Sequence, residues 1–241
     1  MRTVAIVQAR MGSTRLPGKT LLKLDRKNTI LDYVVQQISH CTKIDKIVIA
    51  TTTFEEDNQI EEFAMSKDLF CFRGDPFDVL DRYYQCAKLH SLSTIVRITA
   101  DNPLIDPNIV DLVISEFQSN QCDCATNTFL RTFPYGTEVE VFSFDALKQA
   151  WKYATKKSEK EHVTLYFYKN PSKFKIHNVT NAKNLSTYRL TIDQIEDFIL
   201  VQKIINKIHK RPIYMIDIIN LLMQEPELIN INKNVKHKLL L

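Results

Sequence analysis

The loop after the first apolar run combines three cationic side chains with two glycines, in the sequence ARMGSTRLPGK. Arginine and lysine supply the positive charge and the N–H donors that phosphate oxygens accept. Glycine lets the backbone come close to a ligand. The residues concerned are Arg10, Arg15, Lys19, Gly12 and Gly18. This combination predicts a phosphate-binding loop, and the alternative is a surface loop with solvated cations.

Glycine is otherwise scarce. The chain has four glycines, whereas average usage of about 7% would give roughly 17 in a chain of this length. They are Gly12, Gly18, Gly74 and Gly136. Each lies in a segment that other residues also mark as part of a site, so their positions support the phosphate-loop interpretation.

The loop does not match the P-loop pattern. Five residues separate Gly12 from Gly18, one more than the pattern allows, and Pro17 removes an amide donor beside the second glycine. The dinucleotide fingerprint G-x-G-x-x-G is absent. The sequence therefore disfavours a P-loop kinase or GTPase and argues against a nicotinamide-dependent Rossmann enzyme.

Two aspartates are candidate metal ligands. Asp101, in ITADNPLID, follows a strand-like run, and a carboxylate in that place suits magnesium. The alternative is a turn or helix-capping aspartate, which is the interpretation for Asp106. For Asp193, in RLTIDQIEDF, the local sequence favours a helix N-cap, with Glu196 three residues later completing a capping box.

Three further segments carry candidate binding residues. Arg73, in RGDPFDVL, follows a strand-like run and could reach a base or a phosphate. Alternation along TEVEVF puts Glu138 and Glu140 on one side of a strand, where they could bind a polyol or face water. His162, in SEKEHVTLYF, is near a helix start, where a single histidine is more often a capping or surface residue than a catalytic one. No histidine has metal-ligand spacing with another histidine or a cysteine.

The first half of the chain alternates strand-like and helix-like segments, which predicts a mostly parallel α/β sheet wrapped by helices. The expected strands are 3–8, 46–50, 69–72 and 94–99, and the expected helices are 29–40, 56–66, 77–90 and 108–118. In the second half, strands are expected at 139–142 and 174–179, and helices at 144–155, 159–169, 193–209 and 216–224. Loops 9–19, 73–78 and 100–106 would then lie at the carboxyl ends of strands, where open α/β sheets bind ligands.

No linker or repeat interrupts the chain, so residues 1–230 are expected to form a single domain. Within it, an excursion near 127–180 is expected to close over the site. Residues 231–241 are expected to be a basic C-terminal tail that can fray.

The composition is that of an ordinary folded protein, with 44% apolar and 25% charged residues among 241. A net charge of +4 is too small to argue for a nucleic-acid or membrane partner. Strand-like sequence begins at residue 3 in place of a signal peptide, and no apolar run approaches the roughly 20 residues of a membrane span. These features predict a cytoplasmic protein. Its five cysteines include no C-x-x-C pair and are expected to be reduced.

Taken in order, the segments resemble a known family: ARMGSTRLPGK, RGDPFDVLDRY, ITADNPLID, FPYGTEVEVFSFDAL, EHVTLYF and RLTIDQIEDF. They are similar to the SpsF-like cytidylyltransferases of bacterial polysaccharide synthesis, which are related to the CMP-Kdo and CMP-sialic acid synthetases. The resemblance runs from about residue 3 to 205. It implies a Rossmann-like nucleotidyltransferase fold, usually dimeric, that uses CTP and Mg²⁺.

The resemblance also implies roles for individual residues. Asp193 becomes a metal ligand together with Asp101, in place of the local capping interpretation. Arg10, Arg15 and Lys19 would hold the triphosphate. Gly12 and Ser13 would lie close by, and Arg73 near the nucleotide.

The acceptor is expected to be a sugar acid, which receives CMP as pyrophosphate leaves. Glu138, Glu140 and His162 are its candidate contacts, although FPYGTEVEV has no secure counterpart in the Kdo and sialic acid enzymes. Two alternatives stay open at this point. A glycosyltransferase on a similar sheet is disfavoured because the chain has no Asp-x-Asp sequence. A non-catalytic nucleotide-binding regulator would not need both carboxylates.

Overall fold

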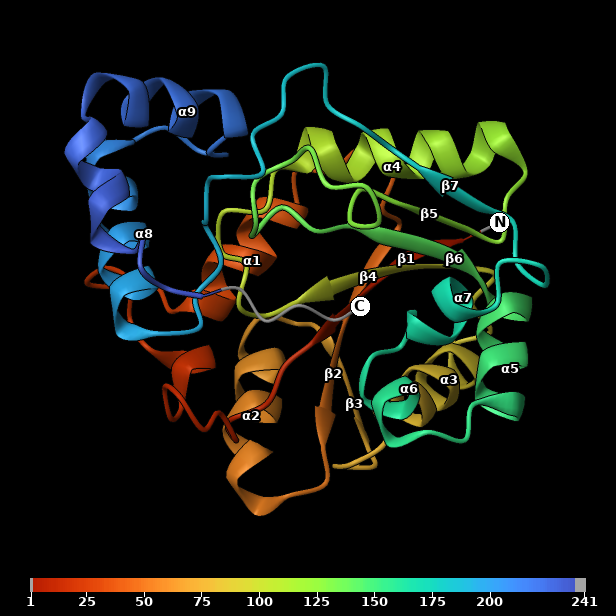
Figure 1. Cartoon of the computed structure of the whole chain (residues 1–241). Coiled ribbons are helices and arrows are strands. Elements are labelled where there is room, and N and C mark those ends of the chain that lie inside the picture. Colours follow the sequence, from red (N-terminus) through yellow and green to blue (C-terminus); the bar gives the residue numbers. More distant parts are fainter. Residues whose placement is uncertain (1, 237–241) are drawn as a thin grey trace.

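The computed structural model describes residues 2–236, and these form one seven-stranded mixed sheet (Figure 1). The strand order is β3-β2-β1-β4-β6-β5-β7. Strands β1 to β4 are mutually parallel, β6 is antiparallel to β4 and β5, and β7 is parallel to β5. The strands are β1 Thr3–Gln8, β2 Lys46–Thr52, β3 Phe70–Gly74, β4 Thr94–Thr99, β5 Cys124–Thr126, β6 Glu140–Ser143 and β7 Ile176–Asn178. The predicted mostly parallel sheet is confirmed.

Helices cover both faces of this sheet. The α-helices are α1 Ile30–Ile38, α2 Asn58–Ser66, α3 Val79–Leu89, α4 Pro107–Asn120, α5 Phe144–Tyr153, α6 Lys157–Glu161, α7 Leu165–Lys169, α8 Ile195–Lys207 and α9 Met215–Gln224. Three 3₁₀ helices, η1 Lys19–Leu21, η2 Glu55–Asp57 and η3 Pro226–Ile231, complete the described elements. Helices α1, α2 and α4 pack on one face, and α3, α5 and α7 on the other.

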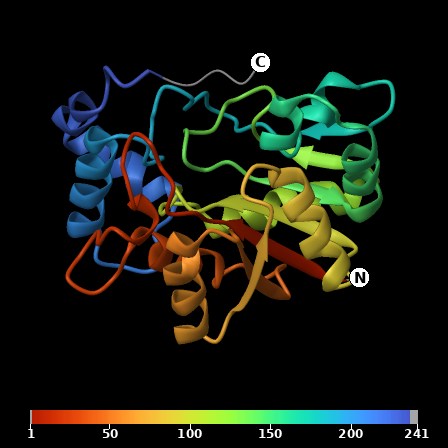
Figure 2. The same cartoon turned by 90° about the horizontal axis from the view of Figure 1, so that it is seen from below.

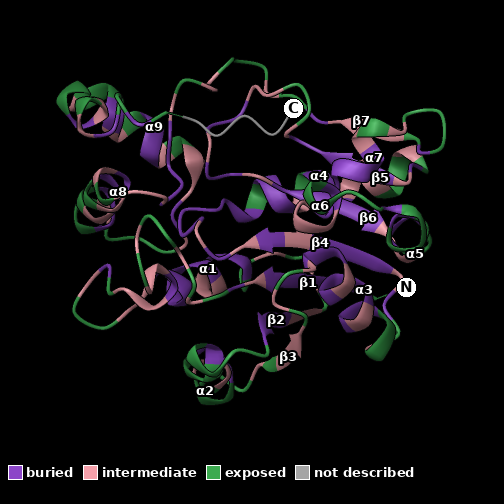
Figure 3. Cartoon of the chain, turned by 60° about the horizontal axis from the view of Figure 1, so that its bottom comes forward, coloured by how far each residue is buried: buried purple, intermediate pink, exposed green. Residues whose placement is uncertain are grey.

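The apolar run of β1 is continuous because both of its faces are buried. Ala5 and Val7 belong to the core beneath α1, α2 and α4, whereas Val4 and Ile6 belong to the core beneath α3 and α5. Most residues of the inner strands β1, β2 and β4 are buried, and the exposed residues lie on the outer sides of the helices and in loops (Figure 3).

A third apolar cluster lies beyond the sheet and joins α8, α9 and η3 to α1. This group forms one end of the molecule, and β5 to β7 lie at the other (Figure 2). Leu190 and Ile192 are fully buried in this cluster. Their burial fixes the extended segment that precedes α8.

The topology places the switch point of the sheet between β1 and β4. From β1 the chain builds β2 and β3 on one side, and then crosses to β4 on the other side of β1. Gln8 at the end of β1 is paired with Thr99 at the end of β4. The loops that leave these two strands therefore begin side by side, at the kind of switch point where open α/β sheets bind ligands.

Two expectations about the second half are corrected. The single helix expected at 159–169 is two short helices, α6 and α7, separated by residues 162–164. The hydroxyl of Thr164 there donates to the buried Glu140 carboxylate, at 2.6 Å, which turns this part of the chain toward β6. The strand expected at 139–142 is β6, which lies one residue later, and the strand expected at 174–179 is the shorter β7.

The expected basic tail begins with packed residues. Asn232 is only 5% exposed, and its side chain donates to the carbonyl of Arg189 at 3.1 Å and to Asp197 Oδ1 at 2.9 Å. The fraying expected from residue 231 is therefore wrong at Asn232. Residues 237–241 of the expected tail lie outside the described residues.

No helix in the part of the chain that the structure describes is both long enough and apolar enough to cross a membrane. All five cysteines are free. Burial raises the pKa of the Cys71 thiol to about 11 and that of Cys86 to about 12, so both thiols stay protonated at neutral pH.

Replacing Gly136 with alanine should destabilise the protein by about 2 kcal/mol or more, because a side chain here requires a strained backbone. Gly136 has φ of 99°, and an added Cβ would lie 2.5 Å from the carbonyl carbon of Leu190 and 2.5 Å from the amide nitrogen of Thr191. Urea denaturation would measure the loss.

Gly12→Ala is the matched control. Its Cβ would meet only Glu56 Oε1, at 2.9 Å, the end of a flexible side chain. Equal losses of stability in the two variants would contradict the assignment of backbone strain to Gly136.

Candidate functional site

Lys19 joins two carboxylates that are far apart in the sequence. Its ammonium donates to Asp101 Oδ2 at 3.0 Å, to Asp193 Oδ1 at 3.1 Å and to the carbonyl of Ile192 at 2.7 Å. Gly18 precedes it with φ of 66°, a left-handed conformation that suits glycine and starts η1. The structure therefore brings together three of the predicted site residues.

The charges of this cluster reinforce one another. Burial opposes the charge on Lys19, but the facing Asp101 and Asp193 carboxylates outweigh it and raise the pKa of Lys19. Burial likewise opposes ionisation of Asp101, and the Lys19 ammonium together with the Thr99 hydroxyl lowers the pKa of Asp101. Both groups are therefore charged at neutral pH.

Short-range contacts orient Asp101 at the end of β4. The hydroxyl of Thr99 donates to Asp101 Oδ1 at 2.5 Å. The neighbouring Asn102 donates to Thr99 Oγ1 and to Glu138 Oε2, each at 3.1 Å, and so links this turn to the excursion. The backbone of Ile192 also donates to the carbonyl of Asp101 at 2.9 Å, which ties the segment before α8 to the same turn.

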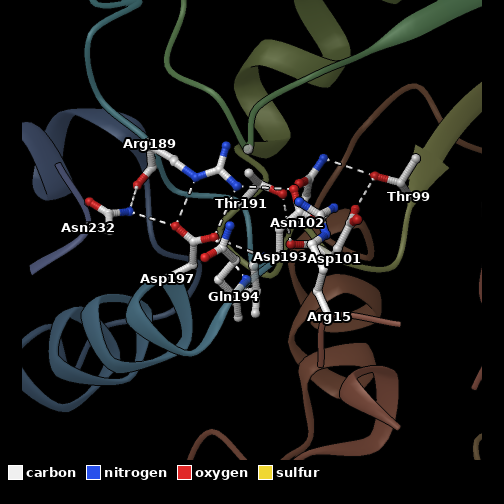
Figure 4. A network of polar contacts seen from close by, with 12 residues as sticks. Arg15, Thr99, Asp101, Asn102, Arg189, Thr191, Asp193, Gln194, Asp197 and Asn232 are labelled. Carbon is white, nitrogen blue, oxygen red and sulfur yellow. Dashed lines mark hydrogen bonds and ion pairs between the residues drawn. The ribbon is translucent and has the colours of Figure 1, made fainter. Parts of the chain in front are cut away.

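Asp193 accepts from two arginines, both labelled in Figure 4, as well as from Lys19. Arg15 donates to its Oδ1 at 2.8 Å, and Arg189 donates to its Oδ2 at 3.0 Å. The local capping interpretation of Asp193 and Glu196 is wrong, because Asp197 accepts the amides at the start of α8. The side chain of Asp193 is thereby left for the cluster.

Arg189 and Asp197 belong to the site, and the sequence analysis missed both. Arg189 makes two hydrogen bonds to Asp197, at 2.8 and 3.0 Å, and the Asp197 side chain is completely buried. Burial opposes ionisation of Asp197, but the hydrogen bonds from Arg189 and Asn232 lower its pKa. Their spacing could have indicated this, since Arg189 and Asp197 each lie four positions from Asp193 within one sequence motif.

The glycine loop is held by a carboxylate on η2. Asp57 accepts from the amide of Met11 at 2.7 Å, and the amide of Ser13 donates to the carbonyl of Met11, also at 2.7 Å. Ser13 Oγ accepts from the amide of Leu16 at 3.4 Å. Gly12 lies in this turn and leaves room for Glu56.

Arg10 is the one predicted triphosphate ligand whose side chain bonds to nothing within residues 2–236. Arg10 is exposed. Burial lowers the pKa of Arg82, which is 1% exposed, and the positive charge of Arg10 adds to this effect. The Nε of Arg82 is buried without a hydrogen-bond partner among the described residues. The Arg10 guanidinium is therefore available to an anionic ligand.

Arg73 is not brought into this cluster. It donates to the carbonyls of Thr52 and Phe54, at 3.0 and 2.8 Å, and to the side chains of Asn58 and Glu61, at 2.5 and 2.8 Å. These contacts tie the end of β3 to β2 and α2. A role for Arg73 at the nucleotide stays a prediction from the family resemblance.

Glu138 and Glu140 do not lie together on one side of a strand as expected, because β6 begins only at Glu140. Glu138 lies by the site, where it accepts from Asn102, from Arg131 at 2.7 Å and from the amide of Gly136 at 2.8 Å. Glu140 is 4% exposed and is bonded to Arg97, Thr164 and Tyr168. Its contacts fasten α7 to the sheet.

His162 ends α6, and its carbonyl accepts from the amide of Leu165 at 2.8 Å. Its role at the substrate stays a prediction.

The donor set at Asp101 and Asp193 fits magnesium. Magnesium prefers hard oxygen ligands and is commonly bound by one or two carboxylates plus substrate phosphates. The two carboxylates converge on one cationic group, the Lys19 ammonium. Residues 2–236 contain no group of three or more histidine, cysteine and acidic side chains arranged to hold a metal without a substrate.

A basic glycine loop facing two carboxylates at the switch point of a parallel sheet defines an α/β nucleotidyltransferase. The chain belongs to the cytidylyltransferase family, whose model matches residues 4–231. The resemblance found in the sequence motifs is thereby confirmed, and so is the enzyme class.

Individual relatives agree with this assignment. The chain is 33% identical to the spore coat polysaccharide biosynthesis protein SpsF of Bacillus subtilis, over 92% of this chain and 94% of that protein. It is 28% identical to 3-deoxy-manno-octulosonate cytidylyltransferase 2 of Hydrogenovibrio crunogenus, over 59% of this chain and 58% of that protein. The structure of a cytidylyltransferase from Leptospira borgpetersenii serovar Hardjo-bovis superposes with a TM-score of 0.93 at 35% identity, covering 98% of this chain and all of that one.

Asp197→Asn should lower the free energy of unfolding at pH 7 by about 3 kcal/mol, because it leaves the buried Arg189 without its main counter-charge. The pKa of Asp197 is lowered in the folded state. Its charge therefore contributes stability above the unfolded value of about 3.9, and this contribution is lost as the pH falls through the lower folded pKa.

Urea denaturation from pH 7 down to pH 3 would measure the difference between wild type and Asp197→Asn, which should shrink in the acid range. Glu62→Gln, which removes an exposed carboxylate, is the control. A difference that stays constant down to pH 3 would contradict the assigned role of the Asp197 charge.

Proposed function

We propose that this enzyme transfers CMP from CTP to the hydroxyl of a sugar acid and releases pyrophosphate. Membership in the cytidylyltransferase family supports the use of CTP. The observation that carries the proposal is the convergence of Lys19, Asp101 and Asp193 at the switch point of the sheet. This arrangement offers cations for phosphates and carboxylates for a divalent ion in one place.

Arg10, Arg15 and Lys19 would bind the triphosphate. Arg10 is free for this, and Arg15 is exposed enough to reorient, with 44% of its side chain accessible. Cations on the β- and γ-phosphates would stabilise the charge that develops on the departing pyrophosphate. Gly12 and Ser13, in the same loop, would lie close to the bound phosphates.

Asp101 and Asp193 would hold Mg²⁺, which, when bound, neutralises phosphate charge and aligns the α-phosphate for attack. The acceptor hydroxyl would lose its proton to solvent and form the new bond to the α-phosphorus, while the bond from that phosphorus to the α–β bridging oxygen breaks and pyrophosphate leaves. Thr99 would keep Asp101 in position through its 2.5 Å hydrogen bond. Lys19 would give up its hydrogen bonds to Asp101 and Asp193 and donate to the phosphates in their place.

A sugar acid as acceptor is supported by the relatives, one of which is named as a 3-deoxy-manno-octulosonate cytidylyltransferase. The part of the excursion that reaches the site carries Glu138 and Arg131. A carboxylate and an arginine can contact the hydroxyls and the acid group of such a substrate. The homodimer and the cytoplasmic location expected from the sequence stay predictions.

Asp101→Asn should reduce the rate of CTP-dependent pyrophosphate release by about 100-fold or more, because it removes a charge that acts at the reacting phosphate. The fold should remain, since asparagine keeps the shape. A coupled pyrophosphate assay with a panel of sugar acids would measure the rate. Near-normal turnover would refute the metal assignment, and CTP binding by wild type without release on any acceptor would favour the nucleotide-binding regulator.

Arg10→Ala should weaken CTP binding by about 10-fold or more, the effect of losing a charge-assisted hydrogen bond. The shift of the melting temperature with CTP, UTP, ATP and GTP, each with and without Mg²⁺, would test both the loop and the base. Arg26→Ala removes another exposed arginine and is the control. Equal CTP affinity in the two variants would remove Arg10 from the site.

A further inference from the structure

The two oxygens of Asp193 are held by different kinds of groups. Oδ1 accepts from Arg15 at 2.8 Å and from Lys19 at 3.1 Å, the residues proposed to bind the triphosphate. Oδ2 accepts from Arg189 at 3.0 Å. The side chain of Arg15 is 44% exposed, whereas that of Arg189 is only 6% exposed. Oδ1 is therefore held in part by an exposed side chain, Arg15, whereas Oδ2 is held by a buried one, Arg189.

Arg189 is fixed by Asp197. The arginine donates twice to this carboxylate, which also accepts from the amides of Asp193 and Gln194 at 3.0 and 3.1 Å. The same carboxylate thus holds both the backbone of residue 193 and the guanidinium that contacts its side chain (Figure 4). Any shift of Asp197 would move Asp193 in two ways at once.

Asn232 closes this unit from the C-terminal segment. Its amide donates to Asp197 Oδ1 at 2.9 Å and to the carbonyl of Arg189 at 3.1 Å. It is 5% exposed and directly follows η3, whose Leu228 is buried in the third apolar cluster. The segment after η3 is therefore anchored to the site as well as to the core.

We propose that Arg189, Asp197 and Asn232 position Asp193 for binding the divalent cation. The inference rests on the proposed function, in which Asp101 and Asp193 hold that ion. When phosphates draw Arg15 and Lys19 away, Arg189 keeps Oδ2 in place, and Oδ1 stays turned toward Asp101. The C-terminal segment thus contributes a positioning residue, Asn232, to a site built from earlier parts of the chain.

The charge balance supports the same assignment. Arg189 is paired with the completely buried Asp197. The negative charge of Asp197 therefore offsets most of the positive charge that Arg189 presents to Asp193. An arginine without that partner would cancel the charge of Asp193 and weaken its attraction for a cation. Asn232 supports the pairing without adding charge. The unit therefore fixes the orientation of Asp193 and leaves its charge available.

Asn232→Ala should raise the Mg²⁺ concentration needed for half-maximal pyrophosphate release by about 10-fold, a usual effect of removing a group that orients a metal ligand. It should lower kcat and leave the affinity for CTP without Mg²⁺ unchanged, since Arg10, Arg15 and Lys19 are untouched. The Mg²⁺ dependence of the CTP-induced melting shift, and Mn²⁺ binding in the presence of CTP, give readouts independent of turnover.

Two controls separate positioning from stability. Asn230→Ala changes an exposed asparagine near the end of the same 3₁₀ helix, whose side chain accepts a hydrogen bond from Lys233 at 3.0 Å. Ile218→Ala removes packing in the third cluster at a residue that does not line the cavity beside Arg189 and Asn232. Both should keep the wild-type Mg²⁺ dependence while they are folded. Asn232→Ser, which retains a short donor, should fall between wild type and Asn232→Ala, and it replaces that variant if alanine prevents folding.

The outcomes for the two proposals are distinct. No Mg²⁺-dependent CTP binding and no pyrophosphate release by wild type would overturn the proposed function itself. An active wild type together with an Asn232 variant whose Mg²⁺ dependence equals that of Asn230→Ala would overturn the positioning role alone. A rise in the required Mg²⁺ in the Asn232 variant, absent from both controls, would support it.

Discussion

The site depends on one ammonium group shared between two carboxylates. Lys19 follows β1, Asp101 follows β4, and Asp193 lies just before α8, so their meeting requires three distant segments to fold against one another. The Lys19 side chain is 13% exposed, and a cation this enclosed needs nearby negative charge. Without the Lys19 ammonium, the Asp101 and Asp193 carboxylates would repel each other at the edge of the sheet.

The fold supplies each member of this arrangement separately. The crossover between β1 and β4 places the glycine loop beside the turn that carries Asp101. The third apolar cluster holds the segment that carries Asp193, through the burial of Leu190 and Ile192. Apolar packing therefore brings the charges together, and their pairing offsets the cost of partial burial.

In this structure the site compensates its own charges. Arg15, Lys19 and Arg189 face Asp101, Asp193 and Asp197, so the cationic and anionic groups are paired with one another. In the proposed reaction a triphosphate and a divalent cation bring the same two kinds of charge. Their binding would exchange the ion pairs within the site for ion pairs with the ligands. Arg189 and Asp197, whose pairing is buried, would stay paired when the ligands bind.

The sequence by itself determined the parallel sheet, the strand ends that carry the site, and the loop containing Arg10, Arg15 and Lys19, because apolar periodicity and glycine placement are local signals. Local signals misled where a contact is made across space. Asp193 looked like a helix cap, but Asp197 takes that role and pairs with Arg189. Alternation grouped Glu140 with Glu138, but Arg97 draws Glu140 into the core. Asn232 looked like part of a frayed tail. Only the tertiary structure decided these partners, since a carboxylate's partner is set by which distant segments packing brings within hydrogen-bond reach.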